Sequence, residues 1–178
     1  MNIESLSFQV IKAQDLTEKE YTEILELCSQ AYERDFKPFM DTFSGATHVL
    51  GRFQSTLVTH ALWVIRWLQT GTLPLLQTAF VEAVATEKKY RDKGFASAVM
   101  KKLAEEISQF DLGALCTGSP ELYARLGWKI WKGPLFIRTQ LGLIPTPNEL
   151  VLILLLPNTP PLDLEAPLSA EWREGELW

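Results

Sequence analysis

The chain has 178 residues, of which 47% are hydrophobic and 22% charged, as in an ordinary globular protein with a sizeable core. Its longest apolar run, 150–156, is far shorter than the roughly 20 residues that cross a bilayer, and its first residues lack a signal sequence. We therefore expect a cytoplasmic protein with no membrane partner. The formal net charge of -5 disfavours nucleic acid as a partner and fits a small cationic molecule better.

Cysteine and histidine are rare in this chain. Cys28 and Cys116 are too few for a disulfide framework, and neither lies at metal-ligand spacing from another Cys or a His. His48 and His60 fall in expected strands without such partners, so we interpret them as packed or surface residues. We predict no metal site.

The first predicted helix spans about 17–34. Thr17 and Glu20 have the spacing of a capping box, and apolar residues then recur at helical intervals. Three antiparallel strands are expected next, where apolar residues alternate or run continuously between turn residues: His48–Phe53, Thr56–Trp67 and Leu75–Thr86.

The second half of the chain begins with a predicted helix over about 94–110 and a short strand near 112–117. Pro120 suits the start of another short helix, which Gly127 closes. Two strands follow, near 135–140 and 149–156. Beyond Pro157 the composition shifts to proline and acids without periodicity, and no repeat or second core is evident. We predict one domain over 1–178, with 157–178 as its tail.

The segment 80–97 contains the most informative pattern. An expected strand runs into a loop with the spacing Arg91-x-x-Gly94-x-Ala96, and an amphipathic helix begins there. The first N–H groups of a helix have no partner inside it, the helix dipole adds positive charge, and small residues let the backbone approach phosphate oxygens. The pattern predicts a pyrophosphate-binding loop, with Arg91 and Lys93 neutralising further charge. The alternative is an ordinary helix start with a glycine and two solvated bases.

Together with Leu122-Tyr123 and Gly127-Trp128, this loop resembles the GNAT superfamily of N-acetyltransferases, whose R-x-x-G-x-G/A loop binds the pyrophosphate of coenzyme A. The resemblance implies acetyl-CoA as cosubstrate and an α/β (α+β) fold. In that fold a mixed, mostly antiparallel sheet of about seven strands is splayed at the fourth strand, with helices on both faces. The implied cofactor contacts are the splayed strand at Val84, Ala85 and Thr86, which would pair with the pantetheine arm, and the loop residues Arg91, Asp92, Lys93, Gly94, Phe95, Ala96 and Ser97.

By the same resemblance, Tyr123 lies near the thioester sulfur and is the candidate general acid. A thiol with a pKa near 8.5 is a modest leaving group, and a positioned hydroxyl could protonate the departing thiolate. The alternative is that Tyr123 only packs the short helix.

The chain also resembles the aminoglycoside 2′-N-acetyltransferases, from about residue 35 to the end. The matching features are Phe80-Val-Glu82, Leu112-Gly-Ala-Leu115, Leu122-Tyr123, Gly127-Trp128, Trp131-x-Gly133-Pro134 and Trp172-Arg173-x-Gly175-Glu176-x-Trp178. The resemblance implies carboxylates around a polycationic aminosugar, with the tail closing the acceptor site and a homodimer as the assembly. The matching positions are Asp35, Asp41, Glu82, Glu176 and the terminal carboxylate of Trp178. The segments 145–149 and 116–119 depart from the subfamily.

Glu82 is the candidate general base. In a regular strand, it would share a face with Phe80, Val84 and Thr86, among residues suited to burial. An ionised carboxylate there must be paired or functional, and an apolar setting would raise its pKa. It could deprotonate the attacking amine through an ordered water. The alternative is a structural ion pair, with Arg52, Arg66 or Lys129 as the partner.

These patterns predict transfer of an acetyl group from acetyl-CoA to a primary amine of a small cationic acceptor, such as the 2′-amine of an aminoglycoside. Glu82 would accept the proton, backbone N–H groups of the splayed strand would polarise the thioester carbonyl, and Tyr123 would protonate the thiolate. Two alternatives stay open. One is a GNAT enzyme for another amine, such as a polyamine, an amino sugar or a peptide N-terminus, and the other is a non-catalytic module that binds acetyl-CoA.

Overall fold

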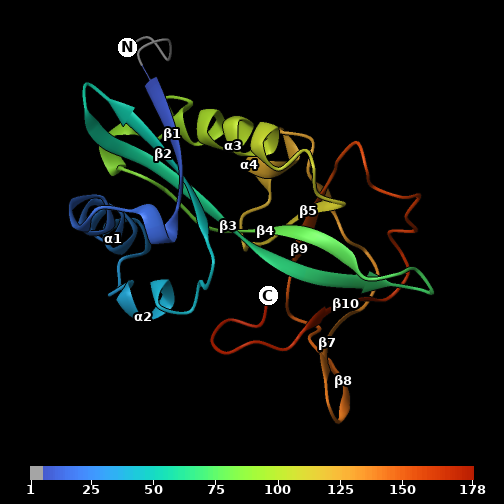
Figure 1. Ribbon diagram of the computed structural model, residues 1–178. Helices are drawn as coiled ribbons and strands as arrows, with labels where there is room; N and C mark the ends of the chain where they lie inside the picture. The colour runs from blue at the N-terminus through green and yellow to red at the C-terminus, as the bar shows by residue number, and fades with distance from the viewer. Residues whose placement is uncertain (1–5) are drawn as a thin grey trace. The chain divides into compact units, whose positions relative to one another are not determined.

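The computed structural model describes residues 6–178 (Figure 1). These residues divide into two compact units. The first unit contains the chain up to Val64 and the segment Val81–Glu106, and the second contains Ile65–Phe80 and Ile107–Trp178. Two long strands, β3 (Thr56–Thr70) and β4 (Leu76–Thr86), contribute residues to both units. Within the described residues the strands hydrogen-bond in the order β6-β9-β5-β4-β3-β10-β7-β8, and β2 joins β1 to β3.

The first unit combines an antiparallel region with helices. β1 (Leu6–Lys12) pairs with β2 (Thr47–Phe53), and β2 pairs with β3. The helices are α1 (Glu18–Tyr32), the short α2 (Lys37–Met40) and α3 (Phe95–Glu106), with 3-10 turns η2 (Ala13–Asp15) and η3 (Lys88–Tyr90).

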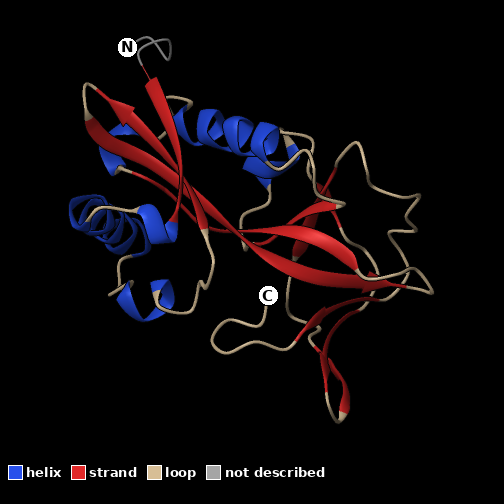
Figure 2. Cartoon of the chain, viewed as in Figure 1, coloured by secondary structure: helices blue, strands red, loops and turns tan. Residues whose placement is uncertain are grey.

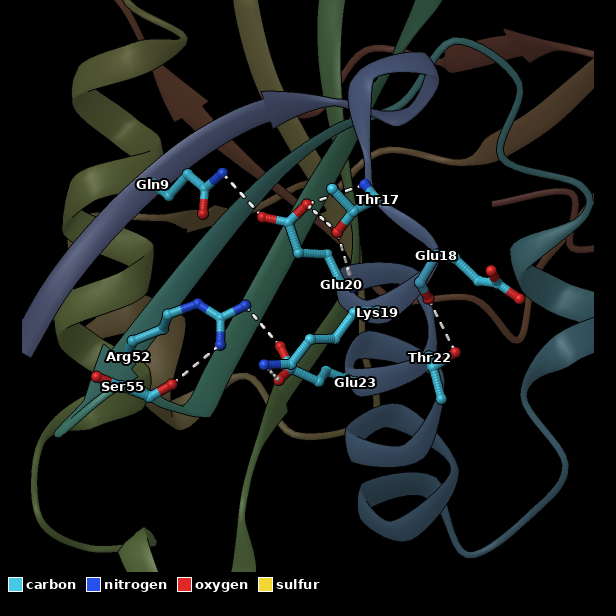
Figure 3. Close-up of polar contacts among 9 residues, drawn as sticks. All are labelled: Gln9, Thr17, Glu18, Lys19, Glu20, Thr22, Glu23, Arg52 and Ser55. Carbon is cyan, nitrogen blue, oxygen red and sulfur yellow. Dashed lines mark hydrogen bonds and ion pairs between the residues drawn. The ribbon is translucent and has the colours of Figure 1, made fainter.

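The start of α1 is fixed by side-chain capping, as the sequence predicts (Figure 3). The Glu20 N–H donates to Thr17 Oγ1 at 3.2 Å, and the Thr17 N–H donates to the Glu20 carboxylate at 2.9 Å. Two further contacts tie the helix to the strands. Gln9 of β1 donates to Glu20 at 3.0 Å, and Arg52 of β2 binds Glu23 at 2.6 Å. Capping and ion pairing therefore orient α1 on this sheet region.

A bulge in β3 makes Val58 and His60 face opposite sides of the sheet, although residues two apart in a regular strand share a side. Gly51 pairs with Thr59 and Arg52 with Leu57, so Val58 is an extra residue in β3. Val58 packs against Phe53 and against Phe95 of α3. His60, two residues on, contacts Cys28 of α1 instead. The helices α1 and α3 thus cover opposite faces of these strands (Figure 1).

The second unit is mainly strand. β5 (Leu112–Cys116) and β6 (Lys129–Ile130) both pair with β9 (Val151–Leu155). β7 (Leu135–Thr139) forms a hairpin with β8 (Gly142–Pro145) and runs parallel to β10 (Leu168–Glu171). The short α4 (Glu121–Ala124) follows β5. Figure 2 shows the long connection between β9 and β10 as loop.

The mixed, mostly antiparallel α/β fold is confirmed, and each predicted helix and strand is present. The expected count of about seven strands is wrong, because the described residues contain ten. The sequence reading assigned no strand to β1, β6, β8 or β10. β6, β8 and β10 have only two to four residues each, and all four residues of β8 are exposed. Segments this short do not show the alternation of apolar and polar residues that identifies a strand. The helix predicted over about 94–110, which is α3, ends at Glu106 instead.

The single domain stays a prediction, since two units share β3 and β4. Among residues 6–178, no helix combines the length and apolar character of a membrane span.

Candidate active site

The loop between β4 and α3 has the geometry of an anion-binding turn. Asp92 and Gly94 both adopt left-handed backbone conformations, with φ of 60° and 83°. The first hydrogen bond of the helix runs from the Ala98 N–H to the Gly94 carbonyl at 2.9 Å. The N–H groups that precede it, at Phe95, Ala96 and Ser97, belong to the first turn, which has no intrahelical acceptors. Left-handed turns and helix N-termini both concentrate N–H groups on an anion.

The basic side chains of the loop donate hydrogen bonds to nearby backbone carbonyls. The Arg91 guanidinium donates to the carbonyls of Thr86 and Ala31, at 3.3 and 3.4 Å. The Lys93 ammonium donates to the Lys89 carbonyl at 2.6 Å. Arg91 therefore ties the loop to β4 and α1. The contacts leave an open pocket in the first unit, lined by Gln30, Ala31, Thr86, Glu87, Lys88, Lys89 and Arg91.

Phe95 anchors the loop in the core of the first unit. Its side chain is 1% exposed and packs against Phe53, Val58 and Tyr90. The Tyr90 and Phe95 rings stack with their centroids 5.4 Å apart. Only the backbone of Phe95 is therefore placed to contact a cofactor, and its side chain fixes the direction in which α3 begins.

The strand β4 is interrupted by a left-handed residue at the expected splay. Ala83 has a φ of 51°, a conformation that costs a non-glycine residue roughly 1–2 kcal/mol. The regular two-residue alternation predicted for Phe80–Thr86 is therefore wrong at Ala83. Glu82, the residue before it, is half-buried. Arg52, one candidate partner for Glu82, binds Glu23 and the Ser55 carbonyl.

Three consecutive carbonyls of β4 accept hydrogen bonds from side chains. His60 Nδ1 lies 2.8 Å from the Ala83 oxygen, the Tyr32 hydroxyl 3.1 Å from the Val84 oxygen, and Thr59 Oγ1 3.1 Å from the Ala85 oxygen. Thr59 also bonds Thr86 Oγ1, at 2.9 Å. These donors come from β3 and α1. The sequence reading missed all three, because no local spacing links them to β4.

His48 and His60 are packed, as expected, but they also bond each other. Both are buried, and His48 Nδ1 lies 3.0 Å from His60 Nε2. Burial lowers the pKa of His48 to about 4 and, with the charge of His48 adding to it, that of His60 to about 3. Both rings are therefore neutral at pH 7. The thiol of Cys28 lies 3.7 Å from His60 Nδ1, and burial raises its pKa to about 12, which makes it unreactive.

In the first unit, the two early acidic residues lie beside α2. The Asp35 carboxylate accepts from the Lys37 N–H at 3.0 Å. The Asp41 carboxylate pairs with the Lys37 ammonium at 3.0 Å and accepts from the Tyr21 hydroxyl at 3.5 Å. Both carboxylates are exposed, so they are also accessible to a cation.

Tyr123 lies on α4 in the second unit. Its ring meets Trp128 edge-on, with centroids 6.3 Å apart. Its carbonyl accepts from the N–H groups of Leu126 and Trp128, which closes the turn. Burial raises the pKa of the Tyr123 hydroxyl to about 12, so it keeps its proton at neutral pH. The protonated hydroxyl can donate to a departing thiolate, although burial makes it a weaker acid than a free tyrosine, whose pKa is near 10.

The C-terminal tail folds onto the strands of the second unit through Arg66 of β3. The buried guanidinium donates to the carbonyls of Leu177 and Glu171, at 2.7 and 2.6 Å, and lies 5.0 Å from the centre of the Phe80 ring. Trp178 is 4% exposed, and its indole N–H donates to Thr146 Oγ1 at 2.8 Å. The signature of the tail thus serves packing in part. The sequence suggests Arg66 as one possible ion-pair partner of Glu82 and gives no signal for its contacts with the tail.

The Trp131-x-Gly133-Pro134 motif is structural. The Trp131 indole N–H donates to the Ala166 carbonyl at 2.9 Å, and the Gly133 N–H donates to the Leu164 carbonyl at 2.9 Å. A β-carbon at Gly133 would collide with the backbone of Ala166. The motif therefore allows the loop before β10 to pass close to β7. Among residues 6–178, no group of three or more His, Cys, Asp or Glu is arranged to hold a metal ion.

Comparison with known proteins gives consistent matches. The profile of a family described as an acetyltransferase (GNAT) domain matches residues 12–131. An aminoglycoside 2′-N-acetyltransferase of Mycolicibacterium fortuitum is 28% identical, over 96% of this chain and 91% of that protein.

Two solved structures with bound cofactor share the fold. The GNAT family N-acetyltransferase YhbS of Escherichia coli, in complex with CoA, has a TM-score of 0.68 at 14% identity, over 96% of this chain and 91% of that one. A GNAT family acetyltransferase of Elizabethkingia anophelis, with acetyl-CoA bound, has a TM-score of 0.57 at 12% identity, over 85% and 99%.

Proposed function

The chain belongs to the GNAT family of acetyl-CoA-dependent N-acetyltransferases, and we propose that its acceptor is a small cationic amine, such as the 2′-amine of an aminoglycoside. The observation that carries the proposal is the match to the M. fortuitum enzyme over 96% of this chain, at 28% identity. A net charge of -5 suits an acceptor with several ammonium groups. The need for acetyl-CoA favours a cytoplasmic location.

The proposed cofactor site combines the β4–α3 loop with the splayed part of β4. The N–H groups at the start of α3, within the segment Arg91–Ser97, would bind the pyrophosphate. The backbone of Val84, Ala85 and Thr86 would pair with the pantetheine arm as an added strand does. The side-chain bonds to the carbonyls of Val84 and Ala85 support this role, because they hold the strand rigid before the cofactor arrives.

In the proposed reaction, the amine nitrogen attacks the thioester carbonyl, and the new N–C bond forms as the C–S bond breaks. Glu82 accepts the amine proton, directly or through water, and Tyr123 donates its proton to the thiolate. The raised pKa makes the Tyr123 hydroxyl a weaker acid than a free tyrosine, so its role as donor is proposed from the motif Leu122-Tyr123 and not from its acidity. The role of Glu82 is supported by its place beside the Ala83 turn.

We propose Asp35, Asp41, Glu82, Glu176 and the Trp178 carboxylate as the acceptor contacts. The exposure of Asp35 and Asp41 supports this, since an ammonium group can displace the exposed Lys37 pairing at little cost.

A homodimer completes the proposal. The second unit exposes large apolar side chains, with Trp67 at 44%, Leu143 at 57% and Trp172 at 58%. Sedimentation should show twice the chain mass, and a monomer would contradict this part.

The acceptor is tested by thiol release from acetyl-CoA with a matched pair of aminoglycosides. Kanamycin B has a 2′-amine and kanamycin A a hydroxyl at that position, while tobramycin and spermidine extend the panel. We expect release with kanamycin B and tobramycin, much less with kanamycin A, and a fall of about 100-fold in the Glu82→Gln variant.

The other outcomes separate the alternatives. Release with spermidine alone, or equal release with the two kanamycins, would discard the 2′-amine and leave another amine as acceptor. Tight binding of acetyl-CoA without turnover on any amine would point to a non-catalytic module.

A further inference from the structure

The buried His48–His60 pair has no part in the proposed chemistry, yet it ends on the peptide group at the splay of β4. Both imidazoles are almost fully buried, at 1% and 0% exposure. A buried polar ring is costly unless its nitrogens are bonded. The two rings meet this need by bonding each other and the Ala83 carbonyl.

The contacts determine which nitrogen of each ring carries the proton. A carbonyl oxygen only accepts, so the proton of His60 lies on Nδ1, 2.8 Å from the Ala83 oxygen. Its Nε2 then accepts from Nδ1–H of His48, at 3.0 Å. Both rings are neutral, in accord with pKa values of about 3 and 4. The pair is thus a directed chain of donors that ends on Ala83.

The Ala83 carbonyl and the Val84 N–H belong to the same planar trans peptide, in which they point in opposite directions. Holding the carbonyl at His60 therefore fixes the direction of the Val84 N–H. The left-handed Ala83 turns this peptide, and a strained residue of this kind persists only where its surroundings hold it.

We propose that His60, supported by His48, is a positioning residue for acetyl transfer: it clamps the Ala83 carbonyl so that the Val84 N–H is aimed at the thioester carbonyl. This inference rests on acetyl transfer at the splayed strand but does not depend on which amine is the acceptor. A fixed N–H donor contributes most as negative charge develops on the carbonyl oxygen, so His60 acts on turnover. Binding of CoA, which has no acetyl group, depends on the pyrophosphate loop instead.

The test compares substitutions that remove or keep the donor. His60→Leu removes it, and His60→Asn keeps an N–H donor near the position of Nδ1. Thr78→Val is the matched control, because Thr78 is also buried and donates to a β4 carbonyl, that of Leu76, at 3.1 Å. The readouts are kcat with an accepted amine and the Kd values of CoA and acetyl-CoA from calorimetry.

We expect His60→Leu to lower kcat by about tenfold or more, with the Kd of CoA changed by less than about threefold. His60→Asn should restore most of the kcat, and Thr78→Val should leave it unchanged. A His60→Leu enzyme with normal kcat would overturn the proposal. So would a loss that His60→Asn does not restore, or one that Thr78→Val reproduces, since either would indicate a general packing role.

Two readouts do not need an acceptor or a folded His60 variant. In the wild-type protein, imidazole ¹⁵N shifts should show protonated Nδ1 in both histidines, and a protonated Nε2 in His60 would overturn the proposal. His48→Leu should weaken acetyl-CoA binding more than CoA binding, and equal weakening would count against the clamp. If no amine is acetylated, the acceptor assignment fails while these measurements still decide the role of His60.

Discussion

In the β4–α3 loop the groups placed for a ligand are backbone N–H groups, whereas in the C-terminal tail the distinctive side chains contact the protein itself. The loop has two left-handed residues, Asp92 and Gly94, and side chains that bond the surrounding backbone. The tail is held through Arg66 and buries the Trp178 ring. Two equally recognisable motifs thus have different physical roles, and each role predicts a different result when it is disturbed.

The largest effect is expected at Gly94. Its φ of 83° is a conformation that a β-branched residue avoids, and a side chain there would also crowd the N–H groups that we propose bind phosphate. We expect Gly94→Val to weaken CoA binding by more than about 100-fold in calorimetry.

The matched control is Gly45→Val. Gly45 also has a positive φ, 69°, and a β-carbon there would meet no atom within 4 Å. The control should lose about 1 kcal/mol of stability but keep its affinity for CoA. If both variants lose affinity equally, the loop has no special role in binding the cofactor.

Tyr123→Phe addresses the second unit. The ring still packs against Trp128, but the proton donor is lost. We expect kcat to fall by about 100-fold with little change in the Kd of CoA and in the melting temperature. An unchanged kcat would remove Tyr123 as the acid and leave it a packing role like that of the tail.

Acid should destabilise the first unit through the two histidines. Their pKa in the unfolded chain is near 6.5, but in the folded protein it is about 4 and 3. Below pH 6.5 the unfolded chain therefore binds protons that the folded protein does not. The stability that depends on the two neutral histidines is fully present above pH 6.5. It is lost as the pH falls, by up to about 1.4 kcal/mol per pH unit for each histidine.

Urea unfolding between pH 7 and 5 measures this loss. His48→Gln should reduce the slope by about half, because one of the two titrating rings is gone. A slope that the substitution does not alter would assign the acid sensitivity to other groups.

A smaller effect is expected from Arg66→Met. The change leaves the carbonyls of Leu177 and Glu171 without their donor, which should cost about 2 kcal/mol in urea unfolding. Carboxypeptidase should then trim the tail faster. Lys132→Met is the control, since the Lys132 ammonium pairs with Glu165 at the surface, at 3.5 Å. A stable Arg66→Met protein with a protected tail would show that packing alone retains the tail.

The sequence predicted what depends on neighbouring residues. The capping box of α1 and the short α4 follow from local spacing, and the Arg91-x-x-Gly94-x-Ala96 pattern predicted a loop followed by a helix, while its phosphate-binding role stays a prediction. The order of these elements and motifs was also sufficient to predict the GNAT family. The proposed roles of Glu82 and Tyr123 stay predictions.

Contacts between distant residues were not predicted. Arg66 bonds Leu177, which lies 111 positions away in the sequence. The residue pattern of β3 does not indicate whether Arg66 binds the tail or lies at the surface. The left-handed turn at Ala83 was also hidden, because alanine gives no signal for a positive φ where glycine would. His60 is an ordinary strand residue in sequence, and its role appears only when β3 lies beside β4.

The extra residue in β3 adds a contact with α3 without shifting the pairing with β2 on either side of it. Val58 itself packs against Phe95, while His60, two positions on, contacts Cys28 on the opposite face. Another apolar residue at position 58 would preserve both contacts. Deleting the position would remove the bulge and leave Leu57 opposite Arg52 and Thr59 opposite Gly51, so His60 would keep its face, and the loss would be the packing of Val58 against Phe95.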